Sequence, residues 1–304
     1  MKRSGRSGPP RIWCVAKPAG PTSFDIVREA RRVSDYRRVG HAGTLDPFAE
    51  GLLVLGLGAA TRLLAHVEAQ TKVYRARVVL GQETDSGDPS GEVIREAEPS
   101  FDPTTLDAVL GGFVGEIEQV PPRYSAIRVG GKRAYDRARA GEEFDVPVRS
   151  VSVDSIEVLE CSPEHLELRV TCGKGTYIRS LARDIGIALG GAAHLGSLVR
   201  ERTGSLELAG AADGENLQRD WEVGRGVLGP EAVVADWPRV DLDADRVHRV
   251  RNGIQPDPAW WGLPGDEDLP EKIALYGPDG QLVALAGTHS ERGLRLSVVL
   301  PEES

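Results

Sequence analysis

One carboxylate stands among small and apolar residues in the stretch G-H-A-G-T-L-D-P-F-A-E-G-L-L, from Gly40 to Leu53. This acid, Asp46, precedes Pro47, and a residue before proline is restricted to extended backbone. A helix cap is the simplest role, with Pro47 at the first helical position. Alternatively, the two glycines and the alanine before Asp46 would let a bulky substrate approach the backbone closely. Spacing alone favours the cap.

Several other chemistries lack their sequence patterns. No phosphate-binding G-x-x-x-x-G-K-[ST] occurs, and no G-x-G-x-x-G follows a predicted strand. The acidic segment E-T-D-S-G-D-P-S-G-E lacks the spacing of a calcium loop and predicts a solvated turn. Three cysteines share no Cys-x-x-Cys spacing, which argues against zinc and disulfides and predicts a reducing cytoplasm. The scattered histidines are interpreted as structural: His66, His165, His194, His248 and His289.

Charge is unevenly distributed along the chain. The 304 residues carry a net charge of −9, which argues against a polyanionic partner for the molecule as a whole. Basic residues nevertheless crowd residues 28–38 and 123–139, apart from the acidic segments. A single charged run is usually a solvated face, but two segregated basic segments favour a polyanion. Residues 1–10 predict a disordered basic arm, and no apolar run is long enough to cross a membrane.

The elements around Asp46 follow from hydrophobic periodicity. Arg11–Ala16 predicts a strand, and Thr22 with Asp25 resembles a capping box for the helix that follows. Residues 72–80 alternate as a strand, which points Tyr74 toward the core or a cleft. A helix after Tyr177 has an apolar stripe of Ile178, Leu181, Ile185 and Leu189, with Arg179 off that stripe.

Strands and helices intermix without regular βαβ alternation. We therefore expect an α+β fold with a mixed, largely antiparallel sheet flanked by helices. Short strands between about 233 and 301 predict a small β-rich C-terminal domain, interrupted by a Pro-rich acidic segment at 256–270.

Six motifs in order carry a family resemblance across most of residues 12–206. The first is K-P-A-G-P-T-S and the second is G-H-A-G-T-L-D-P with G-L-L. The others are K-V-Y-R-A-R-V-V-L-G-Q-E-T-D-S-G-D-P-S-G, Y-S-A-I-R-V-G-G-K-R-A-Y-D-R-A-R-A-G, G-K-G-T-Y-I-R-S-L-A-R-D-I-G and A-H-L-G-S-L-V-R-E-R-T-G. Together they resemble the TruB family, the bacterial tRNA pseudouridine-55 synthases. T-D-S-G-D replaces the commoner T-D-T-x-D, a mild departure.

The resemblance implies an isomerase that detaches uracil from its ribose and rejoins it through C5, without cofactor or metal. It nominates Asp46 as the nucleophile, attacking C6 or C1′, and Arg179 as the cation that keeps it ionised. Tyr74 would stack on the target base and is a candidate for proton transfer. Without the resemblance, Tyr74 could be a core residue and Arg179 a surface ion pair. The remaining substrate-binding candidates are His41, which would fill the space left in the RNA loop, Tyr177 and Leu198, which would line the uracil pocket, Lys17, which would support the active-site loop, and Gly43 and Thr44.

The same resemblance implies how RNA is held. An insertion at about 123–147 within a catalytic domain at 11–230 would grip the T-stem-loop of tRNA, and residues 231–304 would form a PUA-like RNA-binding domain. The candidates for backbone contacts are Arg128, Lys132, Arg133, Lys174 and Arg200. A cytoplasmic monomer is expected. Two alternatives are a non-catalytic tRNA-binding or tRNA-folding protein on this scaffold and a related synthase acting on another RNA. The set Asp46, Tyr74 and Arg179 favours the enzyme.

Overall fold

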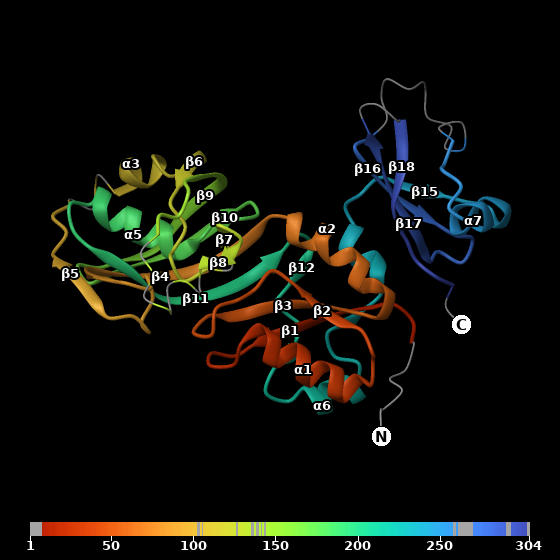
Figure 1. Ribbon diagram of the computed structural model, residues 1–304, viewed down its shortest axis with the longest axis horizontal. Coiled ribbons are helices and arrows are strands. Elements are labelled where there is room, and N and C mark those ends of the chain that lie inside the picture. Colours follow the sequence, from red (N-terminus) through yellow and green to blue (C-terminus); the bar gives the residue numbers. More distant parts are fainter. Residues whose placement is uncertain are drawn as a thin grey trace.

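The computed structural model describes residues 8–101, 104, 106–125, 127–134, 137, 140, 142, 144–257, 260, 270–289 and 293–302. A long sheet runs through the first three quarters of the chain, and a four-stranded sheet stands beside one end of it (Figure 1). The long sheet comprises β1 (Arg11–Lys17), β2 (Val39–Ala42), β3 (Glu50–Leu57), β4 (Lys72–Thr84), β5 (Val93–Ala97), β6 (Gly115–Gln119), β9 (Arg149–Cys161), β10 (His165–Cys172), β11 (Ala193–Thr203), β12 (Leu206–Glu207), β13 (Ala212–Asp213) and β14 (Val227–Leu228).

The strand order of the long sheet is β13-β1-β3-β11-β4-β10-β9-β6, and its pairs are antiparallel except β1 with β13 and β3 with β11. The prediction of an α+β fold with a mixed, largely antiparallel sheet is confirmed. The parallel pair places Arg200 beside Gly51, while β4 runs along the other edge of β11. Strand β11 therefore joins the half of the sheet that carries Asp46 to the half that carries Tyr74.

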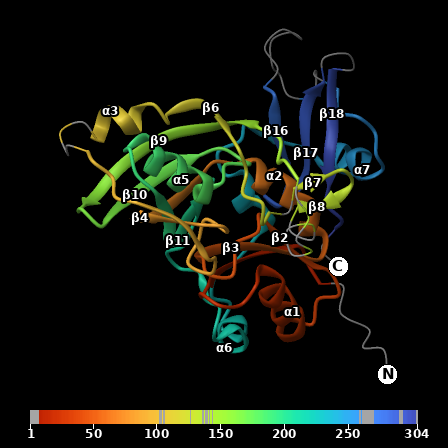
Figure 2. The same ribbon diagram turned by 60° about the vertical axis from the view of Figure 1, so that its left-hand side comes forward.

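Helices cover the two halves separately. Beneath β1–β3 lie α1 (Ser23–Ser34) and α6 (Leu217–Glu222), whereas α3 (Leu106–Gly111) and α5 (Ile178–Ala188) cover the other half (Figures 1 and 2). A 3₁₀ turn, η1 (Gly58–Leu63), leads into α2 (Leu64–Ala69) between β3 and β4. A two-stranded hairpin, β7 (Arg128–Val129) with β8 (Lys132–Arg133), lies within the predicted insertion.

Local sequence signals explain the elements that position the cavity residues. Thr22 and Asp25 form the predicted capping box at the start of α1, each satisfying the other's backbone N–H. Along β4 the side chains of Ala76 and Val78 are buried, as the alternation predicts. On α5 the apolar stripe is also buried, and Arg179 is buried beside it at 5% exposure.

Two predictions for the loops are wrong. No helix follows Asp46: the chain makes a turn in which Ala49 N–H donates to the Asp46 carbonyl, and β3 begins at Glu50. The helix-cap interpretation is therefore excluded, and the charge of Asp46 needs another explanation. The acidic segment after Leu80 is not simply a solvated turn, because β4 continues to Thr84 and the side chains of Ser86 and Asp88 are buried.

The C-terminal sheet has the order β15 (Arg239–Asp241), β16 (Lys272–Tyr276), β17 (Leu282–His289) and β18 (Gly293–Val299). It is preceded by the 3₁₀ turn η3 (Pro230–Val234), and α7 (Ala244–Arg251), which sequence periodicity did not reveal, packs beside it. Apolar residues of this sheet share a buried cluster with β3, so the two sheets pack together. Most of the interruption at 256–270 and residues 1–7 of the predicted arm lie outside the described residues. Among the described helices, none is long and apolar enough to span a membrane.

Candidate active site

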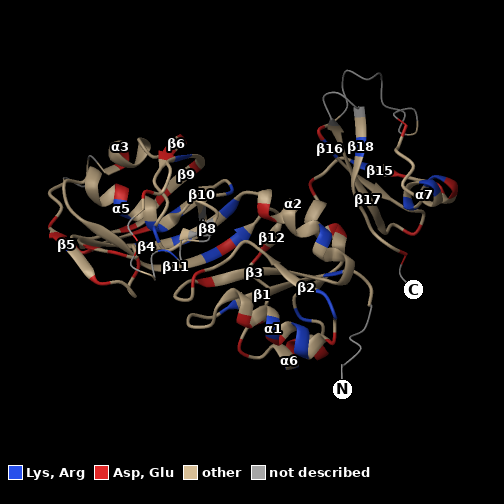
Figure 3. Cartoon of the chain, in the orientation of Figure 1, with Lys and Arg blue, Asp and Glu red and all other residues tan. Residues whose placement is uncertain are grey.

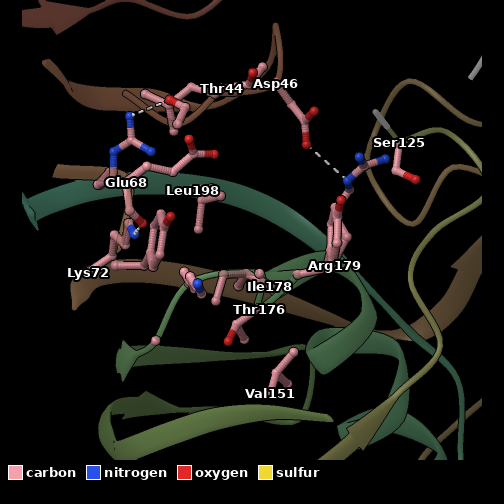
Figure 4. A pocket seen from close by; sticks show the side chains of 18 of the residues that line it. Thr44, Asp46, Glu68, Lys72, Ser125, Val151, Thr176, Ile178, Arg179 and Leu198 are labelled. Carbon is pink, nitrogen blue, oxygen red and sulfur yellow. Dashed lines mark hydrogen bonds and ion pairs between the residues drawn. The ribbon is translucent and has the colours of Figure 1, made fainter. Parts of the chain in front are cut away.

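A cavity of about 650 Å³ opens on the long sheet where the β2–β3 loop, the start of β4, the loop before α5 and β11 meet (Figure 4). Six separate stretches of the sequence line it, at residues 43–46, 65–74, 125, 149–151, 173–179 and 198–200. Of the residues predicted to bind substrate or act chemically, these line the cavity: Gly43, Thr44, Asp46, Tyr74, Tyr177, Arg179 and Leu198. Lys17 and His41 lie outside the lining.

Asp46 and Arg179 form an ion pair across the cavity (Figure 4). The Nε atom of Arg179 lies 3.0 Å from Oδ2 of Asp46. The guanidinium side chain is 5% exposed, whereas the carboxylate side chain is 36% exposed. The acid is thus open to a bound molecule while its cation is covered by protein. This arrangement leaves one face of the carboxylate available for chemistry.

Three further contacts fix the guanidinium of Arg179. Nη1 donates to the carbonyl of Ser86 at 2.9 Å and lies 3.3 Å from Oδ2 of Asp88, and Nη2 donates to the carbonyl of Tyr124 at 2.8 Å. The planar fork therefore bridges the acidic turn, the segment that contains Tyr124 and the loop that carries Asp46. Sequence reasoning missed Asp88, because burial of a turn is a tertiary property. The available signal was the T-D-S-G-D motif.

Opposing influences act on the pKa of Asp46. Burial raises the pKa of Asp46, the nearby charge of Arg179 opposes that rise, and the charge of Asp88 adds to it. A carboxylate whose pKa is raised is a stronger base and a better electron-pair donor than a surface carboxylate. The pair of acids around one arginine therefore leaves Asp46 held in place but incompletely neutralised.

Lys17 fixes the backbone behind Asp46. Its side chain is buried, and Nζ donates to the carbonyls of Pro18, Pro47 and Ala49 at 2.8, 3.2 and 2.7 Å. Burial lowers the pKa of Lys17 to about 8. All three donors of the ammonium are used, so the turn that follows Asp46 is tied to the end of β1. Support of the loop by Lys17 stays a prediction, and these contacts are the geometry that it requires.

Tyr74, Tyr177 and Leu198 supply apolar surface to the cavity. Leu198 on β11 and Tyr74 on β4 come from adjacent strands. Tyr177 immediately precedes α5, and both of its backbone polar groups pair with the buried side-chain amide of Gln119 at 2.8 and 3.1 Å. Gln119 therefore fixes the position of the Tyr177 backbone beside the cavity. No sequence pattern predicted this role for Gln119. Both tyrosines are among the residues that line the cavity.

The residues expected to contact the RNA backbone differ in their exposure to solvent. Lys174 is exposed at the cavity rim, where a phosphate could reach it. Arg200 is 1% exposed and donates to backbone carbonyls, so the expectation of a surface phosphate contact is wrong for this residue. The backbone of Arg128, Lys132 and Arg133 forms the β7–β8 hairpin, while their side chains lie outside what the structure describes.

His41 lies on β2, the strand that leads into the loop carrying Asp46. Its Nδ1 is buried and has no hydrogen-bond partner among the described atoms. Burial lowers the pKa of His41, the charge of Arg200 lowers it further, and Glu68 opposes the change. A neutral ring is therefore favoured. No group of three or more potential metal-ligating side chains occurs among the described residues.

Two solved structures share this fold. The structure described as a Cbf5-Nop10-Gar1 complex aligns with a TM-score of 0.70 and 26% identity, covering 96% of this chain and 84% of that chain. An H/ACA RNP bound to a substrate RNA containing 2′-deoxyuridine gives the same TM-score at 24% identity and covers 97% of this chain and 86% of that one. The architecture is thus that of the pseudouridine synthases.

Sequence comparison defines the family. Residues 31–178 match the N-terminal domain of the TruB family pseudouridylate synthases. The tRNA pseudouridine synthase B of Thermobifida fusca is 42% identical over 288 residues, covering 92% of this chain and 94% of that protein. The protein of that name from Streptomyces coelicolor is 38% identical over 300 residues, covering 95% and 97%. The chain belongs to the TruB family.

Proposed function

We propose that the protein is a tRNA pseudouridine-55 synthase, which converts one uridine of the T-loop to pseudouridine. The curated relatives that align with the chain over nearly their whole lengths are named tRNA pseudouridine synthase B. The observation that carries the proposal is the Asp46–Arg179 pair, whose acid faces a 650 Å³ cavity while its cation is buried. A protein that only binds RNA has no use for a half-desolvated carboxylate, which disfavours the non-catalytic alternative.

The chemistry is an isomerisation that conserves atoms and electrons. Asp46 donates an electron pair to C6 of the base or to C1′ of the ribose, and the N1–C1′ bond breaks. The base turns, C5 bonds to C1′, the C5 proton leaves, N1 gains a proton, and the carboxylate is released. Because the detached base must not escape, the reaction requires a closed and dry pocket. Tyr74, Tyr177 and Leu198 provide the surfaces that hold it.

The target uridine must leave the RNA loop to reach Asp46. Base flipping costs a few kcal/mol, which protein contacts to the loop and to the extruded base repay. Tyr74 stacks on the base, and His41 fills the space that it vacates. The glycine and threonine before the nucleophile, Gly43 and Thr44, leave room for the ribose at the cavity mouth.

Basic residues outside the cavity hold the RNA backbone. Arg128, Lys132 and Arg133 belong to the β7–β8 hairpin within the insertion at 123–147, and Lys174 is exposed at the edge of the cavity. Residues 231–304 act as a PUA-like RNA-binding domain beside the catalytic domain at 11–230. Contacts of this kind depend on phosphate charge, so affinity falls with salt. The overall charge of −9 does not prevent them because the patches are local.

The deciding experiment uses a T-stem-loop transcript labelled with tritium at C5 of uridine. Pseudouridine formation replaces the C5–H bond, so tritium is released into water. Wild-type protein should release one tritium per reactive uridine, and Asp46→Asn should release none while still binding the RNA. Asp35→Asn is the matched control, an exposed acid in a left-handed turn that Asn tolerates. Binding without tritium release by the wild type would support the non-catalytic alternative.

Substrate choice, assembly and location complete the proposal. A transcript with an unrelated uridine loop should react much more slowly than the T-stem-loop; equal rates would indicate a synthase for another RNA.

We infer a cytoplasmic monomer that acts without metal. The described cysteines are free and two of the three are buried, which fits a reducing compartment. Light scattering on the protein during chromatography, with turnover measured in chelator, tests both the monomer and the metal independence.

A further inference from the structure

Arg200 occupies the junction of the three strands that carry the site. On one side its backbone pairs in parallel with Gly51 of β3, and on the other it pairs antiparallel with Tyr74 of β4. The approach to β3 is close: a Cβ atom added to Gly51, whose φ is +103°, would lie 2.4 Å from the Arg200 carbonyl oxygen. Only glycine permits this contact. The backbone of Arg200 is therefore fixed relative to both the nucleophile strand and the tyrosine strand.

The guanidinium of Arg200 reaches back to the nucleophile loop. Nε donates to the carbonyl of Leu52 at 2.7 Å, and Nη2 donates to the carbonyl of Gly43 at 3.0 Å. These two carbonyls flank the loop that contains Asp46, one before it and one after it. With the side chain 1% exposed, both hydrogen bonds are shielded from water. The planar guanidinium of Arg200 thus fixes the distance between the two ends of the loop that carries Asp46.

The charge of Arg200 is not explained by stability. Within the described chain no carboxylate lies within ion-pair distance of it, unlike Arg179, which has two. Burial of a cation without a carboxylate partner is unfavourable, so a neutral side chain would be favoured if packing were its sole role. Arg200 instead lines the cavity and faces Tyr74, where its charge opposes the rise in the Tyr74 pKa that burial causes. The positive charge of Arg200 therefore acts on Tyr74 inside the cavity.

We propose that Arg200 is a positioning residue of the isomerisation, which locks the Gly43–Leu52 loop in register with Tyr74 and so places the Asp46 carboxylate against the flipped uridine. The proposal rests on the proposed function, and it assigns Arg200 a role that acts through the Gly43–Leu52 loop. Misplacement of a reacting group by about 1 Å costs on the order of 10²-fold in rate. Loss of the fork should therefore lower turnover more than RNA affinity.

The experiment compares Arg200→Ala with Arg202→Ala, a matched change to an exposed arginine on the same strand. Tritium release should fall about 100-fold in kcat for Arg200→Ala, with KM changed by no more than about threefold. Millimolar guanidinium chloride, which can enter the vacated space and donate to both carbonyls, should restore at least part of that rate. It should not accelerate Arg202→Ala or Asp46→Asn.

Arg200→Lys covers the case in which the alanine variant unfolds. A single ammonium on a shorter reach cannot hold both carbonyls, so kcat should still fall about tenfold in a folded protein. Wild-type turnover by Arg200→Lys and Arg200→Ala, or a loss that appears only in KM, would overturn the proposal. Failure of the wild-type protein to release tritium would instead overturn the proposed function, so the two failures are distinguishable.

Discussion

Cations are held in two different ways in the two sheets. Around the cavity they are buried and donate to specific carbonyls or carboxylates, as for Lys17, Arg179 and Arg200. In the C-terminal part of the chain they lie over aromatic rings, with distances of 4.1 to 5.6 Å to the ring centroids: Arg239 over Tyr276, Arg249 over Trp260 and Lys272 over Trp237. Arg239 also pairs with Asp241 at 2.7 Å, but both side chains of that pair are exposed. Figure 3 shows basic residues on both β11 and α7.

The contrast separates two uses of positive charge. A buried charge held by short hydrogen bonds sets the energy of atoms a few ångströms away and is little affected by salt. A surface charge on an aromatic face adds to a field that a polyanion senses at longer range. Substitutions at the cavity should therefore change turnover, and substitutions on the surface should change affinity in a salt-dependent manner.

Asp46→Asn should have the largest effect on turnover and the opposite effect on stability. We expect kcat to fall by at least about 10³-fold because the nucleophile is lost. The folded-state pKa of Asp46 is raised, so its ionised form lowers stability at all pH values above the unfolded pKa. The melting temperature at pH 7 should therefore be equal to or above that of the wild type. A marked fall in melting temperature would show that Asp46 is mainly structural.

Lys17→Met should be the next largest. Three buried carbonyls lose their donor, which should cost about 2–4 kcal/mol of stability and about 10²-fold in kcat. Denaturant titration and tritium release measure the two effects, with Lys174→Met as an exposed control near the rim. Because the pKa of Lys17 is lowered to about 8, the folded state binds fewer protons than the unfolded state between about pH 8 and 10.5. The contribution of Lys17 to stability should rise with pH across that window and vanish in Lys17→Met.

The pH dependence of turnover should report the coupling between the two acids. The proposed nucleophile is ionised Asp46, so we expect kcat/KM to fall as the pH drops through a pKa above the ordinary carboxyl value. Asp88→Asn removes a charge that raises this pKa, so the acid limb should move to lower pH. The plateau should fall about tenfold, because Nη1 of Arg179 loses an anchor. An unmoved limb would separate Asp88 from the electrostatics of Asp46.

Lys132→Glu should act on binding alone. Charge reversal on the β7–β8 hairpin should weaken T-stem-loop affinity by about tenfold near 0.1 M salt and reduce the slope of log Kd against log salt by about one. The single-turnover rate at saturating RNA should be unchanged. Filter binding at several salt concentrations makes the measurement, with Glu118→Lys as a control for charge change outside the hairpin. A lower saturated rate would place the hairpin in the chemistry.

Arg249→Glu should have the smallest effect. This exposed arginine on α7 lies over Trp260 in the C-terminal domain, far along the chain from Asp46. We expect a two- to threefold loss of affinity for full-length tRNA, and no change for the isolated T-stem-loop. Equal losses for both RNAs would mean that the C-terminal domain reaches the stem-loop itself.

Sequence reasoning could predict those parts of the site that depend on local pattern. The capping box at Thr22 and the alternation on β4 require only neighbouring residues, and the motifs around Asp46 and Arg179 nominated the pair that the structure brings to 3.0 Å. The interpretation of Asp46 as a helix cap was wrong because Pro47 is compatible with both a helix start and a tight turn. Local preference could not distinguish them.

The remaining parts depend on contacts between distant segments. Asp88 has the sequence context of a solvated turn, and its burial is created by Arg179 from a helix 91 residues later. Arg200 resembles any other arginine on an alternating strand. Its burial follows from the parallel pairing of β11 with β3, which periodicity cannot specify. Gln119 and α7 were missed for related reasons, since a buried amide and a short basic helix leave weak patterns.

Strand β11 also constrains the order in which the molecule can mature. It is inserted between β3 and β4, which are made about 120 to 150 residues earlier, so its pairings are among the most non-local in the fold. Such closure is slow, because loop entropy opposes it until late contacts form. During synthesis, Asp46 emerges long before Leu198 and Arg200. A nascent chain therefore lacks the β11 side of the pocket until this strand leaves the ribosome. We expect no modification of RNA before that point.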